Sequence, residues 1–274
     1  MNTAQLRSRT PPPVRAGWRE PLAPAEPDPR DDPARHRALA VYYGQDGLRQ
    51  LARYRRVAVQ PGHFRANEVI WLQRQGVKVL AYLSLGEDTD PHAPWRLGGA
   101  LPTWNTFQVD LRHPAWAHRV RAQVEAATRF DGFLLDTLES AGNDAQQKRA
   151  MLKLIRQVRA WSGGRYLMAN RGFSLLERLR GTVDAVLIES FTTTWHGGYR
   201  AYSGHELAYT QALLTAARRL RLEVYALDYA DTPALRRTAL RRAAALGVPT
   251  FVTNRNLTLP GGFRASTGAP PSSG

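Results

Sequence analysis

Residues 130–137 read Phe-Asp-Gly-Phe-Leu-Leu-Asp-Thr, a short apolar run that follows a glycine and ends at Asp136. Such a run predicts a buried β-strand over Gly132–Asp136, because parallel strands that are covered on both faces are almost continuously apolar. A helical pattern lies on each side: Pro114–Arg129, with proline in its first turn, and Asp144–Trp161, with aspartate at the N-cap. A strand between two helices predicts a βα unit of a parallel sheet.

The same alternation continues along the chain in both directions. A further helical pattern, Asn67–Gln75, ends at Gly76 in the helix-stop position. Eight strand candidates in about 230 residues match the size of a closed barrel. The sequence therefore predicts an α/β fold, a single (β/α)8 TIM barrel over residues 36–262. The candidates are Leu39–Tyr43, Val57–Gln60, Val77–Leu85, Gly132–Asp136, Arg165–Asn170, Val183–Glu189, Leu222–Asp228 and Val248–Thr253.

The alternative fold is a doubly wound open sheet. Its nucleotide-binding form has a glycine-rich turn after the first strand, whereas this chain reads Tyr-Tyr-Gly-Gln-Asp-Gly there. The barrel is therefore favoured. Little chain follows the eighth strand, so we expect its final helix to be short or missing.

The two ends of the chain differ in composition from the middle. Residues 1–35 contain eight of the 18 prolines and show no hydrophobic period, which predicts a disordered leader, and residues 263–274 predict a disordered tail. No secretory signal is visible in the leader, and no apolar run is long enough to span a membrane. The default location is therefore cytoplasmic, and it becomes extracellular if the start codon is mis-assigned.

Composition excludes several classes of protein. The 274 residues include no cysteine, which excludes a disulfide scaffold, a thiolate metal site and a cysteine nucleophile. The net charge is +15, and the arginines are spread over several helical patterns without any nucleic-acid-binding motif. We therefore expect a solvated basic surface, no specific nucleic acid and a monomer, with a polyanion-binding protein as one alternative.

Polar residues stand at the ends of the predicted strands, where the preceding positions are apolar. In a barrel these ends form the active-site face. Four of the eight residues are carboxylates, and burying a carboxylate without a partner costs several kcal/mol. Four acids on one face therefore indicate a site. The eight residues are Tyr43, Gln60, Glu87, Asp136, Asn170, Glu189, Asp228 and Asn254.

Asp136 and Glu189 are the candidate catalytic residues. Alternation places each of them on the lumen side of its strand, and a single strand separates the two. Side chains that lean inward would reach the separation of roughly 5–9 Å found in glycosidases. One carboxyl then protonates the leaving oxygen while the other, ionised, attacks or activates water. We favour Asp136 as nucleophile or base and Glu189 as acid.

Other chemistries leave weaker traces. The seven histidines form no zinc-peptidase pair, no nucleophile elbow with a serine occurs, and no nucleotide or phosphate loop is found. We therefore expect no cofactor and no metal. A divalent cation held by Asp136, Glu189 and Asp228 stays an open alternative, because oxygen-ligand sites leave weak sequence traces.

Two connections are longer than a βα loop requires. Glu87–Asp110 follows the third strand and Ser190–Gly204 follows the sixth, and both are rich in aromatic residues. The aromatic rings either stack on sugars or pin the loops to the barrel rim. We predict that Trp104 and Trp195 bind substrate.

Five motifs in chain order resemble one enzyme family, and together they cover about residues 38–256. The resemblance is to the glycoside hydrolase family 114 barrel of the endo-α-1,4-polygalactosaminidase type. It implies that Asp136 and Glu189 are the catalytic carboxylates. It also implies that Tyr43, Tyr82, Glu87, Asn170 and Asp228 line the sugar pocket. The motifs are Tyr42-Tyr43-Gly44, residues 79–87 (Val-Leu-Ala-Tyr-Leu-Ser-Leu-Gly-Glu), residues 130–137, Ala169-Asn170-Arg171-Gly172 and residues 186–190 (Val-Leu-Ile-Glu-Ser).

The chain departs from what this resemblance implies in two ways. Members of the family are commonly exported, yet no signal is visible. A deacetylated galactosamine polymer is cationic, so neutral N-acetylated or anionic glycans match the charge of +15 better. The leading hypothesis is a glycoside hydrolase that cleaves internal bonds of an α-linked amino-sugar polysaccharide. A glycan-binding barrel without activity is the second.

Overall fold

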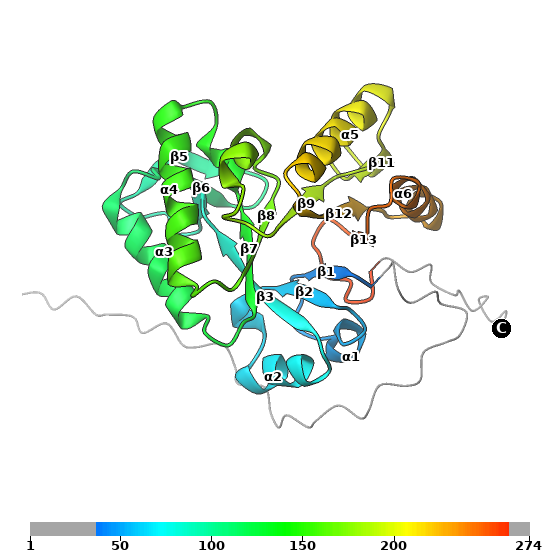
Figure 1. The fold of residues 1–274 in the computed structure, drawn as a ribbon, viewed down its shortest axis with the longest axis horizontal. Helices are drawn as coiled ribbons and strands as arrows, with labels where there is room; N and C mark the ends of the chain where they lie inside the picture. The colour runs from blue at the N-terminus through cyan, green and yellow to red at the C-terminus, as the bar shows by residue number, and fades with distance from the viewer. Residues whose placement is uncertain (1–36, 263–274) are drawn as a thin grey trace, which may run out of the picture.

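The structure is a computed structural model that describes residues 37–262. The leader predicted over residues 1–35 and the tail predicted over 263–274 lie outside the described residues. Eight parallel strands form one sheet that bends into a nearly closed barrel (Figure 1). In order around the sheet they are β1 (Leu39–Tyr42), β2 (Arg56–Val59), β3 (Lys78–Ser84), β7 (Gly132–Asp136), β8 (Tyr166–Asn170), β9 (Ala185–Glu189), β12 (Glu223–Tyr229) and β13 (Thr250–Thr253).

All eight strands lie within about two residues of the predicted ranges, so the predicted TIM barrel is confirmed. The strands β1 and β13 are the two ends of the sheet and lie next to each other (Figure 1). Just beyond them, the backbone N–H of Tyr43 donates to the carbonyl of Leu257 at 2.8 Å. This hydrogen bond ties the first and last segments together at the barrel mouth.

Helices lie between most of the strands and cover the outside of the barrel (Figure 1). A 3-10 segment over Phe173–Leu179 takes the place of a helix between β8 and β9. From the end of β13 to residue 262 the described chain forms no helix. The helices are α1 (Leu48–Leu51), α2 (Ala66–Arg74), α3 (Pro114–Ala126), α4 (Ala145–Trp161), α5 (Gly204–Arg219) and α6 (Pro233–Ala245).

The helix α4 forms where its local sequence predicts. The side chain of Asp144 accepts hydrogen bonds from the backbone N–H groups of Gln146 and Gln147, which satisfies two donors that a helix start leaves free. One stripe of the helix, which includes Met151 and Ile155, is fully buried. This amphipathic pattern fixes which side of α4 faces the barrel.

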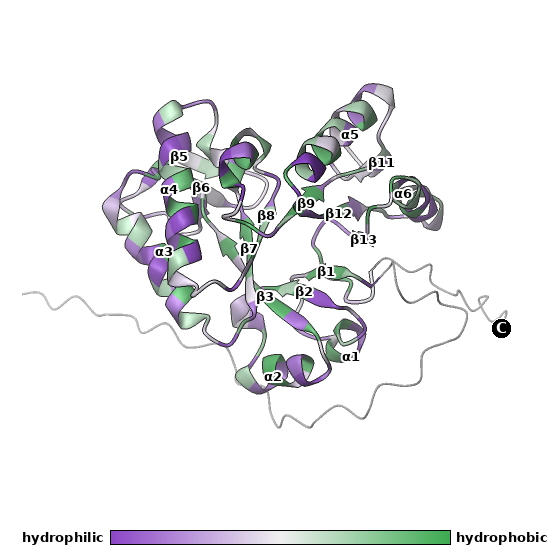
Figure 2. Cartoon of the chain, in the orientation of Figure 1, coloured by the Kyte–Doolittle hydropathy of each residue, from purple (hydrophilic) through white to green (hydrophobic). Residues whose placement is uncertain are grey.

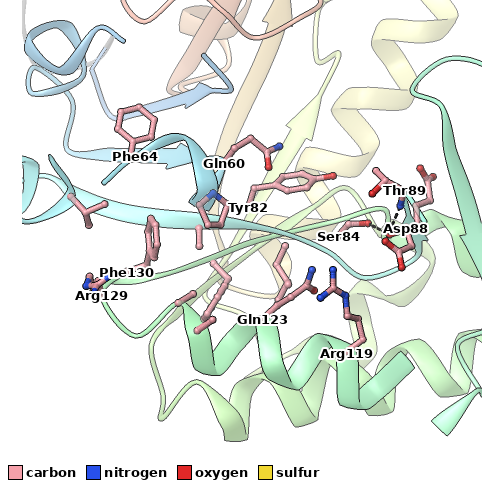
Figure 3. Close-up of a pocket in the computed structure, with 18 of the residues that line it drawn as sticks. Gln60, Phe64, Tyr82, Ser84, Asp88, Thr89, Arg119, Gln123, Arg129 and Phe130 are labelled. Carbon is pink, nitrogen blue, oxygen red and sulfur yellow. Dashed lines mark hydrogen bonds between the residues drawn. The ribbon is translucent and has the colours of Figure 1, made fainter. Parts of the chain in front are cut away.

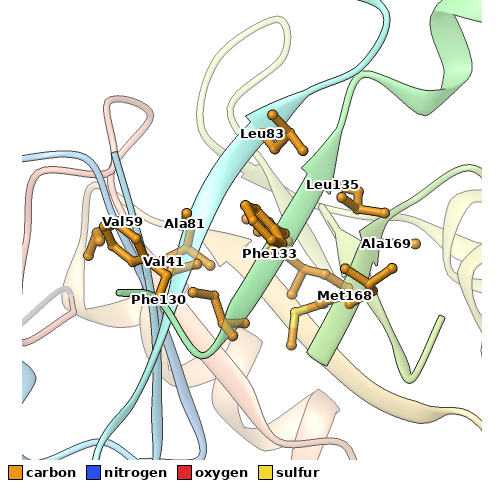
Figure 4. Packing of buried hydrophobic residues seen from close by; sticks show 14 of the residues in the cluster. Val41, Val59, Ala81, Leu83, Phe130, Phe133, Leu135, Met168 and Ala169 are labelled. Carbon is orange, nitrogen blue, oxygen red and sulfur yellow. The ribbon is translucent and has the colours of Figure 1, made fainter. Parts of the chain in front are cut away.

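Alternation of side chains sorts the core into the barrel interior and the layer beneath the helices. On β12, Leu227 and Tyr229 belong to the same buried cluster as Leu187 of β9, whereas Ala226 packs with Leu214 of α5. Figure 4 shows part of the main cluster, and Figure 2 shows largely hydrophobic strands in the centre, with helices of mixed character around them. Odd-numbered residues of β12 therefore face the interior and even-numbered residues face outward.

Two small sheets extend from the barrel mouth. The long connection after β3 folds into an antiparallel sheet of β4 (Glu87–Asp88), β6 (Thr106–Val109) and β5 (Arg96–Leu101). The connection after β9 forms the hairpin β10 (Thr193–Thr194) and β11 (Arg200–Ala201). Both long loops are thus ordered structures at the rim on which active sites of barrels are built.

Candidate active site

Asp136, Asn170 and Glu189 end three neighbouring strands, β7, β8 and β9. The side-chain amide nitrogen of Asn170 donates one hydrogen bond to Asp136 Oδ1 and another to Glu189 Oε2, both at 2.8 Å. The two carboxylate oxygens therefore lie no more than twice that distance apart. One amide thus clamps two acids at a separation compatible with a single glycosidic bond between them.

Each of these three residues is followed by a residue in the left-handed region. Thr137 has φ 61°, Arg171 has φ 56° and Ser190 has φ 52°. A residue with a Cβ atom pays about 1–2 kcal/mol for this conformation, so it persists only where the surroundings impose it. Three such turns in a row, directly after the three polar residues, are the kind of local strain that collects at functional sites.

Three tyrosines surround the acid pair. Tyr229 Oη donates to Glu189 Oε1 at 2.6 Å, and the hydroxyl of Tyr82 hydrogen-bonds Asp136. Tyr43 packs edge-on against Tyr82, with 5.2 Å between ring centres. Burial first, and then the nearby negative charges and tyrosines, raise the pKa of all three tyrosines well above the usual value. All three therefore stay protonated, and Tyr229 and Tyr82 donate hydrogen bonds to the two acids.

The surroundings of Asp136 raise its pKa toward neutral pH. Burial, and next the charge of Glu189, raise the pKa of the Asp136 carboxyl to about 6. Hydrogen bonds from the backbone of Thr137 and from Asn170 act in the opposite direction and are outweighed. A carboxyl that titrates about two units above its usual value is suited to acid–base chemistry near neutral pH.

Asp228, the fourth acid predicted for the site, lies elsewhere. Its side chain is fully buried and accepts hydrogen bonds from the backbone N–H groups of Thr192 and Thr193 and from the Thr192 hydroxyl, at 2.7–2.9 Å. It belongs to the outward-facing set of β12 and fixes the start of the loop after β9. The sequence analysis expected Asp228 at the acid pair, but a shift of one residue along a strand changes the face on which a side chain lies. The next residue, Tyr229, faces Asp136 and Glu189 instead.

Glu87 also lies apart from the acid pair. It begins β4, and its carboxylate accepts hydrogen bonds from the hydroxyls of Thr106 at 2.7 Å and Ser140 at 3.2 Å. These contacts join the small sheet after β3 to the segment after β7. Neither partner belongs to the acid pair, so the structure places Glu87 as a link between two rim segments.

The two tryptophans that are predicted to bind substrate, Trp104 and Trp195, differ in exposure. Trp104 is half exposed (51%), whereas Trp195 is largely buried. The Arg255 guanidinium lies 4.4 Å from the centre of the Trp195 ring, and His196 stacks on that ring at 3.9 Å. Arg255 and His196 together therefore cover much of the Trp195 ring. Arg255 also lies over the Trp104 ring, at 5.3 Å, but Trp104 has the larger exposed surface of the two.

Contacts from the rim to the acids run through residues that the sequence analysis missed. Trp104 meets Trp195 edge-on at 5.8 Å, and Trp195 meets Tyr229 in the same way at 6.4 Å. Tyr229 lies one residue beyond the predicted strand, which ended at Asp228. It continues the alternation of Leu227, and this pattern would have identified it as an interior residue. Arg255 follows the last strand, and no sequence signal singles it out.

The described residues hold no group of three or more His, Asp or Glu side chains that could bind a metal ion. In particular, Asp228 faces away from Asp136 and Glu189, so the cation site that combined the three does not form. The same described residues contain no helix that is long and apolar enough to cross a membrane. What the geometry offers is acid–base and nucleophilic chemistry by two carboxyls.

Comparison with known proteins gives a family model and several relatives. Residues 56–269 match the model of glycoside-hydrolase family GH114. A protein of Deinococcus radiodurans that is described only as uncharacterized is 26% identical over 282 residues, which cover 91% of this chain and 89% of the relative.

Solved structures agree with the family match. The glycoside hydrolase domain of PelA from Pseudomonas aeruginosa is 28% identical, with a TM-score of 0.74 over 81% of this chain and 96% of that chain. Ega3 of Aspergillus fumigatus, solved in complex with galactosamine, shares the fold at 14% identity, with a TM-score of 0.63 over 84% of this chain and 95% of that chain.

Proposed function

The chain belongs to glycoside-hydrolase family GH114, and from this premise we propose that it cleaves internal bonds of an α-linked amino-sugar polysaccharide of the galactosaminan type. Asp136 and Glu189 are the proposed catalytic carboxyls. The observation that carries the proposal is the clamp by Asn170, which holds one oxygen of each acid at 2.8 Å from the same nitrogen.

The choice of an amino sugar rests on the relatives. The PelA domain, at 28% identity, is a glycoside hydrolase, and Ega3 was solved with galactosamine bound. Galactosamine polymers and their N-acetylated forms are therefore the first substrates to test. The internal mode of attack and the α-1,4 linkage come from the resemblance to polygalactosaminidases.

The separation of the acids favours retention of configuration. Retaining enzymes hold their carboxyls about 5–5.5 Å apart, whereas inverting enzymes need about 6.5–9.5 Å to admit a water molecule. Glu189 donates its proton to the glycosidic oxygen as Asp136 bonds to the anomeric carbon and the leaving chain departs. Glu189 then takes a proton from water, which attacks the same carbon and releases Asp136.

Asp136 suits the nucleophilic role because several donors converge on it, and it is ionised above pH about 6. Activity should then fall as the pH drops below 6, because the nucleophile becomes protonated. If Asp136 were instead the proton donor, activity would fall as the pH rises above 6. The pH dependence of kcat/KM therefore separates the two assignments.

The direct test is product release from galactosamine and N-acetylgalactosamine polymers, followed by mass spectrometry. Glu189→Gln is expected to lower kcat by at least about 10³-fold, roughly 4 kcal/mol of barrier. The matched control is Glu139→Gln, since Glu139 is an exposed rim carboxylate paired with Arg171 at 2.9 Å. Full activity in Glu189→Gln, or none in the wild-type chain on any of these polymers, would contradict the proposal; the second result favours a binding barrel.

A further inference from the structure

A second cavity lies outside the barrel wall, between α2 and α3 (Figure 3). Its volume is about 480 Å³, within the range of about 300–1,000 Å³ that is typical of small-ligand sites. Phe64, Val69 and Phe130 line it together with Leu83 of β3. The walls thus combine apolar surface with a few polar groups, as ligand sites do.

Arg119 and Gln123 of α3 line this cavity, and Arg119 is also exposed to solvent. Figure 3 shows Arg119 and Gln123, one helical turn apart, rising from α3 toward β3. The Gln123 Oε1 atom is buried and accepts no hydrogen bond from residues 37–262. Within the same residues Arg119 forms no ion pair, and Arg129 at the other end of the cavity forms none either. A buried polar atom without a protein partner is uncommon and needs an explanation, which a bound ligand would supply.

The acids at the rim end of the cavity do not meet these needs. Asp88 accepts hydrogen bonds from Trp95 Nε1 at 2.9 Å and from the backbone of Thr89 at 2.8 Å. Glu87 is bound by Thr106 and Ser140, as described above. The lining therefore holds two acids as well as Arg119 and Arg129. Directly beside the Arg119 guanidinium, an acceptor or an anion is favoured and an ammonium group is disfavoured.

The cavity adjoins the candidate active site. Tyr82 lines the cavity, and its hydroxyl hydrogen-bonds Asp136. A polymer bound at the acid pair would reach the cavity over the rim end of β3, where Ser84, Glu87 and Thr106 line it. This continuity favours a distant part of the same glycan over an unrelated ligand.

We propose that the α2–α3 cavity is an accessory site for an N-acetylhexosamine unit of the polysaccharide, an inference that rests on the proposed function. The N-acetyl carbonyl accepts from Arg119, and a ring hydroxyl pairs with the Gln123 amide, since a hydroxyl both donates and accepts. The methyl group and the C–H face of the sugar lie against the apolar wall. A deacetylated unit loses the carbonyl and adds a positive charge beside Arg119.

The test uses the full chain with 13C-labelled alanine methyl groups. Ala81, Ala126 and Ala127 line the cavity and report on it by NMR, independently of the acid pair. Titration with N-acetylgalactosamine is expected to shift these methyl signals, and galactosamine is expected to bind at least tenfold more weakly. Acetate serves as the comparison for a simple anion.

Variants complete the test. Arg119→Ala combined with Gln123→Leu should weaken N-acetylgalactosamine binding at the cavity by at least about tenfold, with kcat unchanged and the KM for the polymer raised. The matched control is Arg121→Ala, since Arg121 is exposed on the same helix and paired with Glu125 at 2.7 Å. The control should stay within twofold of wild type.

Several results would overturn this inference. They are alanine methyl signals that do not shift, binding of galactosamine or acetate as tight as that of N-acetylgalactosamine, and no effect of the double variant on binding. Polymer hydrolysis with silent methyls would refute the cavity alone. Methyl shifts without any hydrolysis would refute the proposed function and leave the cavity as a sugar-binding site.

Discussion

Asp136 and Asp228 are two aspartates that each follow an apolar run in a strand of the same barrel, yet their surroundings are opposite. Asp136 is partly open, shares Asn170 with Glu189 and has a pKa raised to about 6. Asp228 is fully buried, and the loop after β9 supplies hydrogen bonds to both of its oxygens. Asp136 can therefore take part in a reaction, whereas the Asp228 carboxylate is used to hold the backbone of the loop after β9.

The difference arises because side chains alternate along a strand, so that a shift of one residue places a side chain on the other face. Asp136 follows Leu134 on the lumen side, whereas Asp228 follows Ala226 on the side of the helices. A buried carboxylate with backbone donors stabilises a loop, and one with another carboxylate beside it has a raised pKa. The following five substitutions test this contrast and the contacts around it, in order of expected effect.

Asp136→Asn should abolish turnover without harm to the fold. We expect kcat to fall by at least about 10³-fold, roughly 4 kcal/mol. The folded protein holds the proton of Asp136 up to pH about 6, while the unfolded chain releases it near 4. Wild-type stability should therefore fall by about 1–3 kcal/mol from pH 4 to 7 relative to the variant. Urea unfolding at several pH values measures this, and an identical pH dependence in both proteins would contradict it.

Asp228→Ala should show the reverse behaviour, with the main loss in stability. Removing the carboxylate leaves the buried N–H groups of Thr192 and Thr193 without acceptors, which costs about 2–4 kcal/mol in total. Thermal unfolding measures the loss. Asp228→Asn keeps one acceptor oxygen and serves as the control with a smaller loss. If Asp228→Ala unfolds like wild type and only kcat changes, Asp228 belongs to the chemistry after all.

Tyr229→Phe tests whether the missed tyrosine positions Glu189. The variant keeps the ring and removes the hydroxyl that donates to Glu189 at 2.6 Å. We expect kcat to fall by about 10–100-fold, or about 1.5–3 kcal/mol, with KM nearly constant and one limb of the pH profile displaced. Tyr43→Phe is the matched control, because Tyr43 contacts Tyr82 edge-on through its ring. An unchanged pH profile in Tyr229→Phe would reduce the hydroxyl to a packing role.

Trp104→Ala and Trp195→Ala give the smallest expected effects and should differ from each other. Trp104 is half exposed, so its loss should raise KM by about three- to tenfold and leave stability within about 0.5 kcal/mol. Trp195 is covered by Arg255 and His196, so its loss should destabilise by about 1–3 kcal/mol as well. Calorimetry and steady-state kinetics on both variants decide this. Equal stability of the two variants would restore the prediction that both tryptophans serve only the substrate.

Local patterns were sufficient for the architecture. The apolar runs marked all eight strands, and the N-cap at Asp144 and the proline at the start of α3 marked helix starts. Each of these signals depends on neighbours within a few residues, so the sequence contains them in full. The position of Asn170 between the two acids also followed from strand order once a barrel was assumed.

The sequence by itself determined the eight-stranded barrel and proposed Asp136 and Glu189 as neighbours across one strand. Only the tertiary structure decided which strand-end residues face the mouth, because twist and register set the phase of each strand and a single residue reverses the face. It likewise decided that Asp228 holds a loop, that Tyr229 meets Glu189, and that Arg255 covers Trp195. The two residues of each contact are 36 to 60 positions apart in the sequence. No local pattern specifies such a contact, because it forms only when the barrel closes.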